Sequence, residues 1–398
     1  MFSRSLLVLL CAWTVLTLLS NSRHAEADDD LMAIATRLQT SIEEHFSTNR
    51  NHEVNPTNKD NTINYIKEEL EGYGLEVELM EFAGENNAVR YEGTNVIGVL
   101  PGKRKGTAAD NVLVLGSHFD TVRTTPGVND NGSGMAVFLE AIKLVISEVC
   151  RFTNTVVFVA FDLEETQPVG HGLIGSDHFV QDWLAPFLVN DNGQNSTFQG
   201  AVVLETLMNF NATDNSQVFP PGMDLAFPEL YSKIEARNFP GDFVTVVGRA
   251  EDDATLMSGF TNQWKTLGHG EYFNESVPLP FTGVPTEQDR LLYRDFFRSD
   301  HTSFWRYEPD SFKAIFLTDT ANFRGNMMEC YHQECDDVDS ISDEKMLFLA
   351  KTTRSVANMI KELGVDNLED TCISGSTEQR LTPLVFLGVV WFITVIIK

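Results

Sequence analysis

The sequence predicts an α/β protein with a mixed, largely parallel central sheet that helices cover on both faces. Apolar runs of strand length alternate along the chain with longer apolar or amphipathic runs of helix length. The strand-length runs end in polar residues rather than continuing as apolar segments. The 398 residues, of which 42% are hydrophobic, are enough to bury a sizeable core. We therefore expect three layers, with the sheet in the middle.

The elements can be assigned in chain order. Residues 28–110 are expected to form two helices and then two strands, at 31–46, 62–73, 75–82 and 94–100. The run Val112–Leu115 ends at Gly116-Ser117 and predicts a buried strand, and the run Met135–Ile146 has the length of a helix. Further strands are predicted at 155–161, 201–204, 243–247 and 313–317. Further helices are predicted at 177–183, 227–237 and 342–363, whereas 277–285 is expected to be a loop.

The net charge and the two chain ends indicate the compartment and the partners. A formal charge of −28 argues against nucleic-acid binding, which needs clustered Lys and Arg. Residues 1–27 have the pattern of a secretory signal peptide, with Arg4 before the apolar run Leu6–Leu19 and a small residue, Ala27, at the cleavage site. Residues 373–398 have the pattern of a GPI-attachment signal, with a short tail anchor as the alternative. Residues 28–372 are expected to form a single domain at the cell surface or outside the cell.

The cysteines and the sequons fit an extracellular protein. Four cysteines remain after removal of the signal peptide, and Cys330 and Cys335, which bracket a short loop, are predicted to form a disulfide. The pairing of Cys150 and Cys372 stays open. Asn131 begins a sequon but is expected to lie unmodified in the functional site. Glycosylation is predicted at Asn195, Asn211 and Asn274.

Side chains that commonly bind metals follow four of the predicted strands. They are His118, Asp130, Glu164, Glu165, Glu205 and His332. Ligands of open α/β sheets gather at the carboxyl ends of the strands, so we expect these side chains to converge. Two histidines and three carboxylates can hold two divalent ions, with Asp130 as the natural bridge. Asp120 is placed to accept a hydrogen bond from the second ring nitrogen of His118.

Two metal ligands must each be chosen from a pair of candidate residues. Glu164 and Glu165 are adjacent and cannot both point the same way in an extended chain. One of them can bind a metal while the other acts as general base. His301 and His332 compete for the last ligand position, and the carboxyl-end rule favours His332, which follows the strand at 313–317. His301 then becomes a residue on the substrate side of the site.

Several motifs resemble those of a known family. They are GSHFDTV, PGVNDNGSG, FVAFDLEE with GLIGSDHF, RSDHTSFW, and FLTDTANFR with YHQECDD. Together they resemble the dizinc exopeptidases of the bacterial leucyl aminopeptidase type, whose relatives include glutamate carboxypeptidases and glutaminyl cyclases. The similarity covers most of residues 60–360. It implies the three-layer, phosphorylase/hydrolase-like fold of zinc-dependent exopeptidases, with residues 28–372 as a single catalytic domain.

The resemblance also implies roles for individual residues. One zinc ion is expected on His118 and Glu205, a second on Glu165 and His332, and Asp130 bridges the two. Glu164 is implied as the general base, Tyr331 as a residue that stabilises the oxyanion, and Asp120 as the partner of His118. Relatives often hold a non-proline cis peptide just after the bridging Asp, here between Asp130 and Asn131. The chain departs from many members in having Glu205 where they have Asp.

The predicted function is that of a secreted or cell-surface zinc metallopeptidase. It is expected to remove N-terminal residues from peptides through a hydroxide that bridges two Zn²⁺ ions. Carboxypeptidase, dipeptidase or glutaminyl cyclase-like activity at the same metal centre remains an alternative, as does a non-catalytic surface receptor of this fold. His301, Asp300 and Arg324 are predicted to bind substrate. The preferred N-terminal residue and the oligomeric state are left open.

Overall fold

The computed structural model describes residues 29–86, 88–149, 151–165, 172–189, 193 and 195–365. The predicted signal peptide, the predicted C-terminal signal, Cys150 and Cys372 lie outside these residues. Within the described ranges, no helix combines the length and the apolar character that crossing a bilayer requires.

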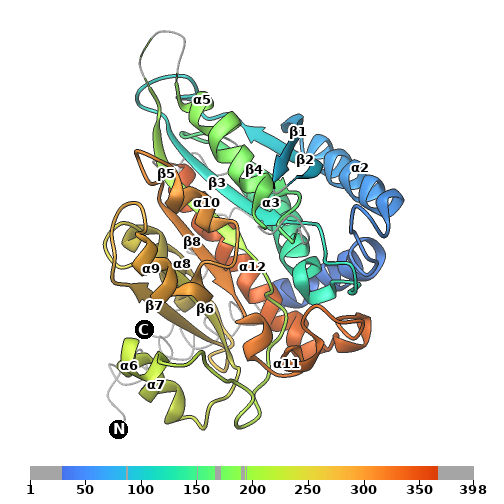
Figure 1. Ribbon diagram of the computed structural model, residues 1–398, viewed down its shortest axis with the longest axis vertical. Helices are drawn as coiled ribbons and strands as arrows, with labels where there is room; N and C mark the ends of the chain where they lie inside the picture. Colours follow the sequence, from blue (N-terminus) through green and yellow to red (C-terminus); the bar gives the residue numbers. More distant parts are fainter. Residues whose placement is uncertain are drawn as a thin grey trace, which may run out of the picture.

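The described strands form one sheet in the order β1-β2-β4-β3-β5-β8-β6-β7 (Figure 1). Their bounds are Glu76–Asn86 (β1), Val89–Leu100 (β2), Asn111–His118 (β3), Val156–Phe161 (β4), Thr197–Leu204 (β5), Phe243–Arg249 (β6), Phe273–Leu279 (β7) and Ala314–Thr318 (β8). Strands β4, β3, β5 and β8 run parallel to one another. Strands β1 and β2 add an antiparallel edge, and β6 runs antiparallel to β8 and parallel to β7. The predicted mixed, largely parallel sheet is confirmed.

The helices are those at residues 29–45, Pro56–Gly72 (α2), Gly134–Glu148 (α3), Ile174–His178 (α4), Ala185–Leu188 (α5), Met223–Ala226 (α6), Pro228–Glu235 (α7), Ala254–Thr266 (α8), Glu287–Leu292 (α9), His301–Arg306 (α10), Met327–Cys330 (α11) and Asp343–Gly364 (α12). One apolar core joins the sheet to the helix at 29–45, α2, α3, α8 and α12. A second core joins the opposite face to α5, α6, α7 and α10. The three predicted layers follow from these two cores (Figure 1).

Strand β3 shows why the central strands are apolar throughout. Leu113 and Leu115 point into one core, whereas Val112 and Val114 point into the other. Successive side chains of a strand face opposite sides of the sheet, and here both sides are covered. The strand therefore has no solvent-facing row of polar residues. Asn111 at its amino end is partly exposed, and Ser117 and His118 at its carboxyl end are buried.

Among the elements whose boundaries differ from the sequence predictions are α2 and β7. Helix α2 begins at Pro56 rather than near residue 62, because Asn55 caps it and proline is well tolerated in the first turn. Residues 277–279 belong to β7 rather than to a loop, and Val277 pairs with Val247 of β6. Pro278 obscured this strand in the sequence, but β7 lies at the edge of the sheet, where proline is tolerated.

Candidate metal centre

Five side chains converge at the carboxyl ends of the parallel strands in two groups that share one member. His118, Asp130 and Glu205 form the first group, and Asp130, Glu165 and His332 form the second. In each group the potential ligand atoms lie within 4.8 Å of one another. These are the five residues that the sequence predicts as ligands. Asp130 is the shared member, as expected of a residue that bridges two ions.

The potential ligand atoms are buried and have no hydrogen-bond partner. They include His118 Nε2, both carboxylate oxygens of Asp130, Glu165 Oε1, Glu205 Oε2 and His332 Nε2. His332 Nε2 lies 2.9 Å from Glu165 Oε1 and 3.2 Å from Asp130 Oδ2. Buried polar atoms are normally paired, so this many unpaired atoms facing one another fits a site for divalent cations.

The pKa values of the carboxylates in the cluster also indicate a cation site. Burial raises the pKa of Glu165 to about 7 and that of Glu205 to about 8, and the nearby Asp130 carboxylate adds to both shifts. Burial also raises the pKa of Glu164 well above its usual range, with further contributions from Glu205 and Glu165. Several carboxylates thus share a dry site in which their charges repel, and bound cations would relieve that repulsion.

Asp120 organises both sides of this centre. Its Oδ1 lies 3.4 Å from His118 Nδ1, as predicted for the partner of that ring. Its two oxygens also accept hydrogen bonds from the backbone N–H groups of Glu164 and Glu165, each at 3.0 Å. One carboxylate therefore fixes the histidine and the backbone of both glutamates, a second task that sequence reasoning did not predict.

A buried ion pair supports the turn that carries the two glutamates. Lys59 of α2 lies 2.7 Å from Asp162, and both side chains are almost fully buried. Asp162 also accepts hydrogen bonds from the backbone N–H groups of Thr94 and Leu163, both at 2.8 Å. Leu163 takes a left-handed conformation with φ of 57°, so Glu164 follows a sharp change of chain direction. Lys59 was missed because a lysine in an amphipathic helix normally faces solvent.

Removing the Lys59 charge is expected to destabilise the protein strongly. Lys59→Met leaves the Asp162 carboxylate buried without its partner, which should lower the free energy of unfolding by about 3–5 kcal/mol. Lys67→Met on the same helix is the matched control, because Lys67 and Glu71 form an exposed pair and its loss should change stability by less than about 1 kcal/mol. Urea unfolding measures both. Equal effects of the two substitutions would contradict the assignment, and Lys59→Met with Asp162→Asn should recover much of the loss.

Hydrogen bonds of Asp336 and Asn131 fix the loop that carries Asp130. Asp336 accepts hydrogen bonds from the backbone N–H groups of Asn129 and Asp130, at 2.7 and 3.0 Å. The Asn131 amide donates to Ser117 Oγ and to the backbone oxygens of His118 and Leu204. Asn131 is thus fully buried and fully engaged, in accord with the expectation that it carries no glycan. The expected cis peptide between Asp130 and Asn131 is present.

A disulfide encloses the last ligand. Cys330 and Cys335 are bonded, as predicted, and Tyr331 and His332 lie inside the loop that they close. The Tyr331 ring stacks on the His332 ring, with 3.8 Å between centroids. The guanidinium of Arg298 lies 5.2 Å from the centroid of the Tyr331 ring and donates to Asn322 Oδ1 at 2.8 Å. Arg298 was not singled out from the sequence, although it opens the RSDHTSFW motif.

The predicted substrate-binding residues His301, Asp300 and Arg324 are all buried. His301 is fully buried, its Nε2 lies 2.9 Å from the Phe296 carbonyl oxygen, and burial lowers its pKa to about 3. Arg324 is also fully buried and donates to Gln217 Oε1 and the Phe243 carbonyl oxygen. Neither side chain is exposed, and their contact with substrate stays a prediction. Asp300 is buried as well, and its charge acts on Glu164.

The three predicted glycosylation sites differ in their surroundings. Asn195 is exposed, whereas Asn211 and Asn274 are partly buried. Asn211 Oδ1 accepts from the Thr213 backbone, and Asn274 Nδ2 donates to Thr261 Oγ1 at 3.3 Å. Glycosylation at all three positions stays a prediction.

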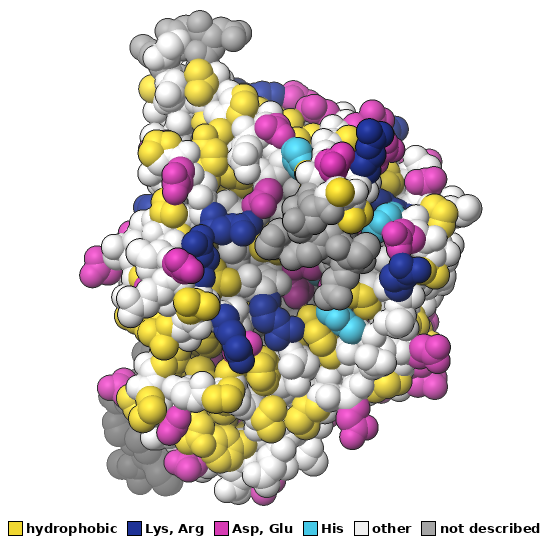
Figure 2. Space-filling model, viewed as in Figure 1, with side chains coloured by type: hydrophobic (Ala, Val, Ile, Leu, Met, Phe, Trp, Pro, Cys, Tyr) yellow, Lys and Arg dark blue, Asp and Glu magenta, His cyan; other side chains and the backbone are white. Residues whose placement is uncertain are grey.

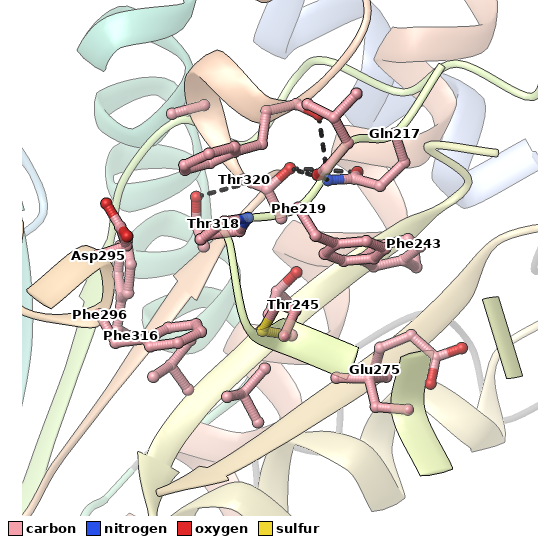
Figure 3. Close-up of a pocket in the computed structure, with 18 of the residues that line it drawn as sticks. Gln217, Phe219, Phe243, Thr245, Glu275, Asp295, Phe296, Phe316, Thr318 and Thr320 are labelled. Atoms are coloured by element: carbon pink, nitrogen blue, oxygen red, sulfur yellow. Dashed lines mark hydrogen bonds between the residues drawn. The ribbon is translucent and has the colours of Figure 1, made fainter. Parts of the chain in front are cut away.

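An apolar cavity opens beside the centre. It encloses about 690 Å³ of space, counting its open mouth, and Glu205 and Arg298 form part of its wall. Figure 3 shows other lining residues, among them Phe219, Thr245 and Phe316. Most of the wall comes from the segment 206–300, which the sequence left irregular. On the face shown in Figure 2, Lys and Arg side chains lie along one side of a central recess in which acidic atoms are visible. The lining includes Phe219, Met223, Leu230, Ile234, Phe243, Val247, Val277, Phe296, Phe316 and Phe323.

Comparison with known proteins identifies related sequences. The model of Peptidase family M28 matches residues 95–220, a range that contains His118, Asp130, Glu165 and Glu205. Leupeptin-inactivating enzyme 1 of Streptomyces exfoliatus is 27% identical over 314 residues, which cover 76% of this chain and 55% of that protein. Protein YfbL of Escherichia coli is 25% identical over 250 residues, covering 61% and 64%. The chain thus spans less than two thirds of the length of these curated relatives.

A shorter match is closer in sequence. An aminopeptidase of Pseudomonas aeruginosa is 40% identical over 93 residues, which cover 23% of this chain and 16% of that protein.

Solved structures share the fold. The LapA aminopeptidase of Legionella pneumophila superposes with a TM-score of 0.54 at 18% identity, covering 85% of this chain and 75% of its own. A glutaminyl cyclase of Bacteroides thetaiotaomicron bound to N-acetylhistamine gives a TM-score of 0.54 at 15% identity, covering 81% and 97%. At these sequence identities the solved structures show only that the fold is shared. The family match is independent of them and includes four of the five potential ligands. Residues 95–220 of the chain are thus similar to Peptidase family M28, and the chain has the fold of aminopeptidases and glutaminyl cyclases of known structure.

Proposed function

We propose that this protein is a zinc-dependent exopeptidase that removes N-terminal residues from peptides and holds two Zn²⁺ ions per chain. The observation that carries the proposal is the pair of ligand groups that share Asp130, with buried and unpaired donor atoms beside an apolar cavity. The mixture of imidazole and carboxylate donors suits zinc. The aminopeptidases among the relatives support the choice of reaction.

The residues around the centre are arranged for amide hydrolysis. Bound zinc ions would act as Lewis acids on the scissile carbonyl and lower the pKa of the attacking water. Glu164 is not needed as a ligand, and its Oε2 lies 4.0 Å from His118 Nε2, on the inner side of the centre. It is placed to take a proton from the water and to pass it to the leaving amine. The Tyr331 hydroxyl is the candidate donor to the oxyanion that develops on the carbonyl oxygen.

The cavity supports an N-terminal rather than an internal cleavage site. Its apolar wall suits one large apolar side chain, and its rim carries Glu205. The carboxylates of the centre give this end of the cavity the negative charge that the α-ammonium of a bound peptide would need. A peptide seated in this way presents its first peptide bond to the metal centre.

The function is tested with aminoacyl fluorogenic substrates on the purified protein. We expect hydrolysis of substrates with a free α-amine, loss of activity with a chelator and recovery on addition of zinc. Acetylation of the α-amine should abolish cleavage, because the ammonium loses its charge. Cleavage of blocked peptides alone would instead support the carboxypeptidase alternative, and cyclisation of N-terminal glutamine without hydrolysis would support the cyclase alternative.

We also propose that the protein acts at the cell surface or outside the cell. The signal-peptide pattern at 1–27, the GPI-signal pattern at 373–398 and the Cys330–Cys335 disulfide support this location. Treatment of intact cells with a phosphatidylinositol-specific phospholipase tests the anchor. Protein that stays on the cells would favour a tail anchor.

A further inference from the structure

The floor of the apolar cavity is a strip of the central sheet with one polar row. Strand pairing places Thr245 of β6 opposite Thr318 of β8 on one side and Glu275 of β7 on the other. The next inward-facing row is apolar, because Val247 pairs with Phe316 and Val277. All of these side chains line the cavity. A ligand in the cavity therefore meets a polar line across an otherwise apolar floor.

Most polar atoms along this line already have partners. The Glu275 carboxylate accepts hydrogen bonds from Lys233 at 2.6 Å and Arg237 at 3.2 Å. Thr318 Oγ1 lies 2.9 Å from Thr206 Oγ1 and accepts from the Thr320 backbone N–H. These pairs leave neither Glu275 nor Thr318 in need of a ligand.

Thr245 is the exception. Its side chain is buried, with 4% of the residue exposed, and its Oγ1 has no hydrogen-bond partner. In Figure 3 the hydroxyl points up from the floor into the space between Phe219 and Phe316. Among the described residues that line the cavity, only Thr245 Oγ1 and Glu205 Oε2 are buried side-chain oxygens without a partner. Buried hydroxyls are normally paired, so an unpaired one facing a cavity suits a polar group of a ligand.

The two unpaired oxygens belong to residues of strands, or strand ends, that lie two apart in the sheet. Glu205 follows β5, and Thr245 is in β6, with β8 between them. Two interstrand spacings amount to about 10 Å between their backbones. A tyrosyl residue that forms a hydrogen bond at each end, through its α-amine and its phenol oxygen, can bridge a gap of this order. The walls between them present flat aromatic surfaces, from Phe219, Phe243, Phe296, Phe316 and Phe323.

We propose that the cavity selects peptides with an N-terminal tyrosine, whose phenol hydroxyl forms a hydrogen bond with Thr245. This inference rests on the proposed aminopeptidase function and names its substrate class. The α-amine lies toward Glu205, the ring packs between the phenylalanines, and the phenol reaches the polar row. Phenylalanine or leucine fills the same space but leaves the Thr245 hydroxyl unpaired, and a site built to bind a hydroxyl discriminates against ligands that lack one.

The test compares substrates and variants that each differ by one hydroxyl group. Tyrosyl and phenylalanyl aminomethylcoumarins are hydrolysed by the wild-type protein and by Thr245→Val, which keeps the shape of the side chain and removes its hydroxyl. We expect kcat/KM to favour tyrosine by roughly tenfold in the wild type, the effect of one buried hydrogen bond. In Thr245→Val the ratio should fall close to one. Thr245→Ser, which keeps the hydroxyl, should retain the preference and shows that the site still folds.

Two outcomes separate this inference from the proposed function. An active enzyme that hydrolyses both substrates equally, or a tyrosine preference that Thr245→Val leaves intact, would overturn the inference alone. If the zinc-loaded protein hydrolyses neither substrate, the proposed function fails, and the cavity is then tested by calorimetric binding of tyrosine amide and phenylalanine amide. Tighter binding of tyrosine amide that Thr245→Val abolishes supports the hydroxyl site, whereas equal binding of the two amides overturns it.

Discussion

Glu164→Gln is expected to lower kcat by a factor of about 10²–10⁴, the range that a general base contributes. The amide keeps the size of the side chain but cannot take a proton from the attacking water. The five potential ligands are unchanged, so the zinc content and the thermal stability should stay close to those of the wild type. Steady-state kinetics with a free-amine substrate and elemental analysis of the same sample measure both quantities.

The control for this substitution removes another buried carboxylate. Glu140 of α3 is buried and paired with Arg37, away from the metal centre. Glu140→Gln should leave kcat near the wild-type value even if stability falls. Full activity of Glu164→Gln would refute the assignment of Glu164 as the base. A loss of zinc from Glu164→Gln would instead make Glu164 a ligand.

Asp130→Ala is expected to remove both zinc ions and all measurable activity. Asp130 belongs to both ligand groups, and it is the only described residue that does so. Its removal leaves each ion with two protein ligands, fewer than the three that catalytic zinc sites keep. Metal content after dialysis, measured per chain, gives the result directly. Circular dichroism of the same sample shows whether the fold persists without the ions.

Glu205→Ala is the matched comparison, because Glu205 belongs to one group only. We expect this variant to keep the ion held by Asp130, Glu165 and His332 and to lose or weaken the other. The contrast between the two variants tests the bridging arrangement itself. Two ions retained by Asp130→Ala, or both lost equally from Glu205→Ala, would contradict a centre that is bridged by Asp130.

The metal centre and the cavity come from different parts of the chain. Most of the potential ligands lie in the range 95–220 that matches Peptidase family M28, whereas the cavity wall comes mainly from the segment 206–300. The reaction can therefore be shared with relatives while the choice of N-terminal residue is set by this chain. The Tyr331–His332 pair completes the centre from a third segment, inside the Cys330–Cys335 loop.

The sequence alone identified the residues that converge on the centre. Each follows an apolar strand, and parallel strands bring their carboxyl ends to the same edge of a sheet, so local patterns were sufficient. The disulfide was predictable for a similar reason, because Cys330 and Cys335 are close in the chain. The central strands of the sheet were also predictable, since β3 and β4 are buried on both faces and leave continuous apolar runs.

Only the tertiary structure decided how distant segments support and shape the site. Lys59 reads as a surface lysine until α2 places it against Asp162, and packing buries the predicted substrate contacts His301 and Arg324. Thr245 could not be identified from the sequence as a residue of the cavity. Its position depends on the register of β8, β6 and β7, and its hydroxyl stands out only because the structure gives it no partner. Local patterns report which face of an element is buried, whereas pairing between elements far apart in the chain depends on the whole fold.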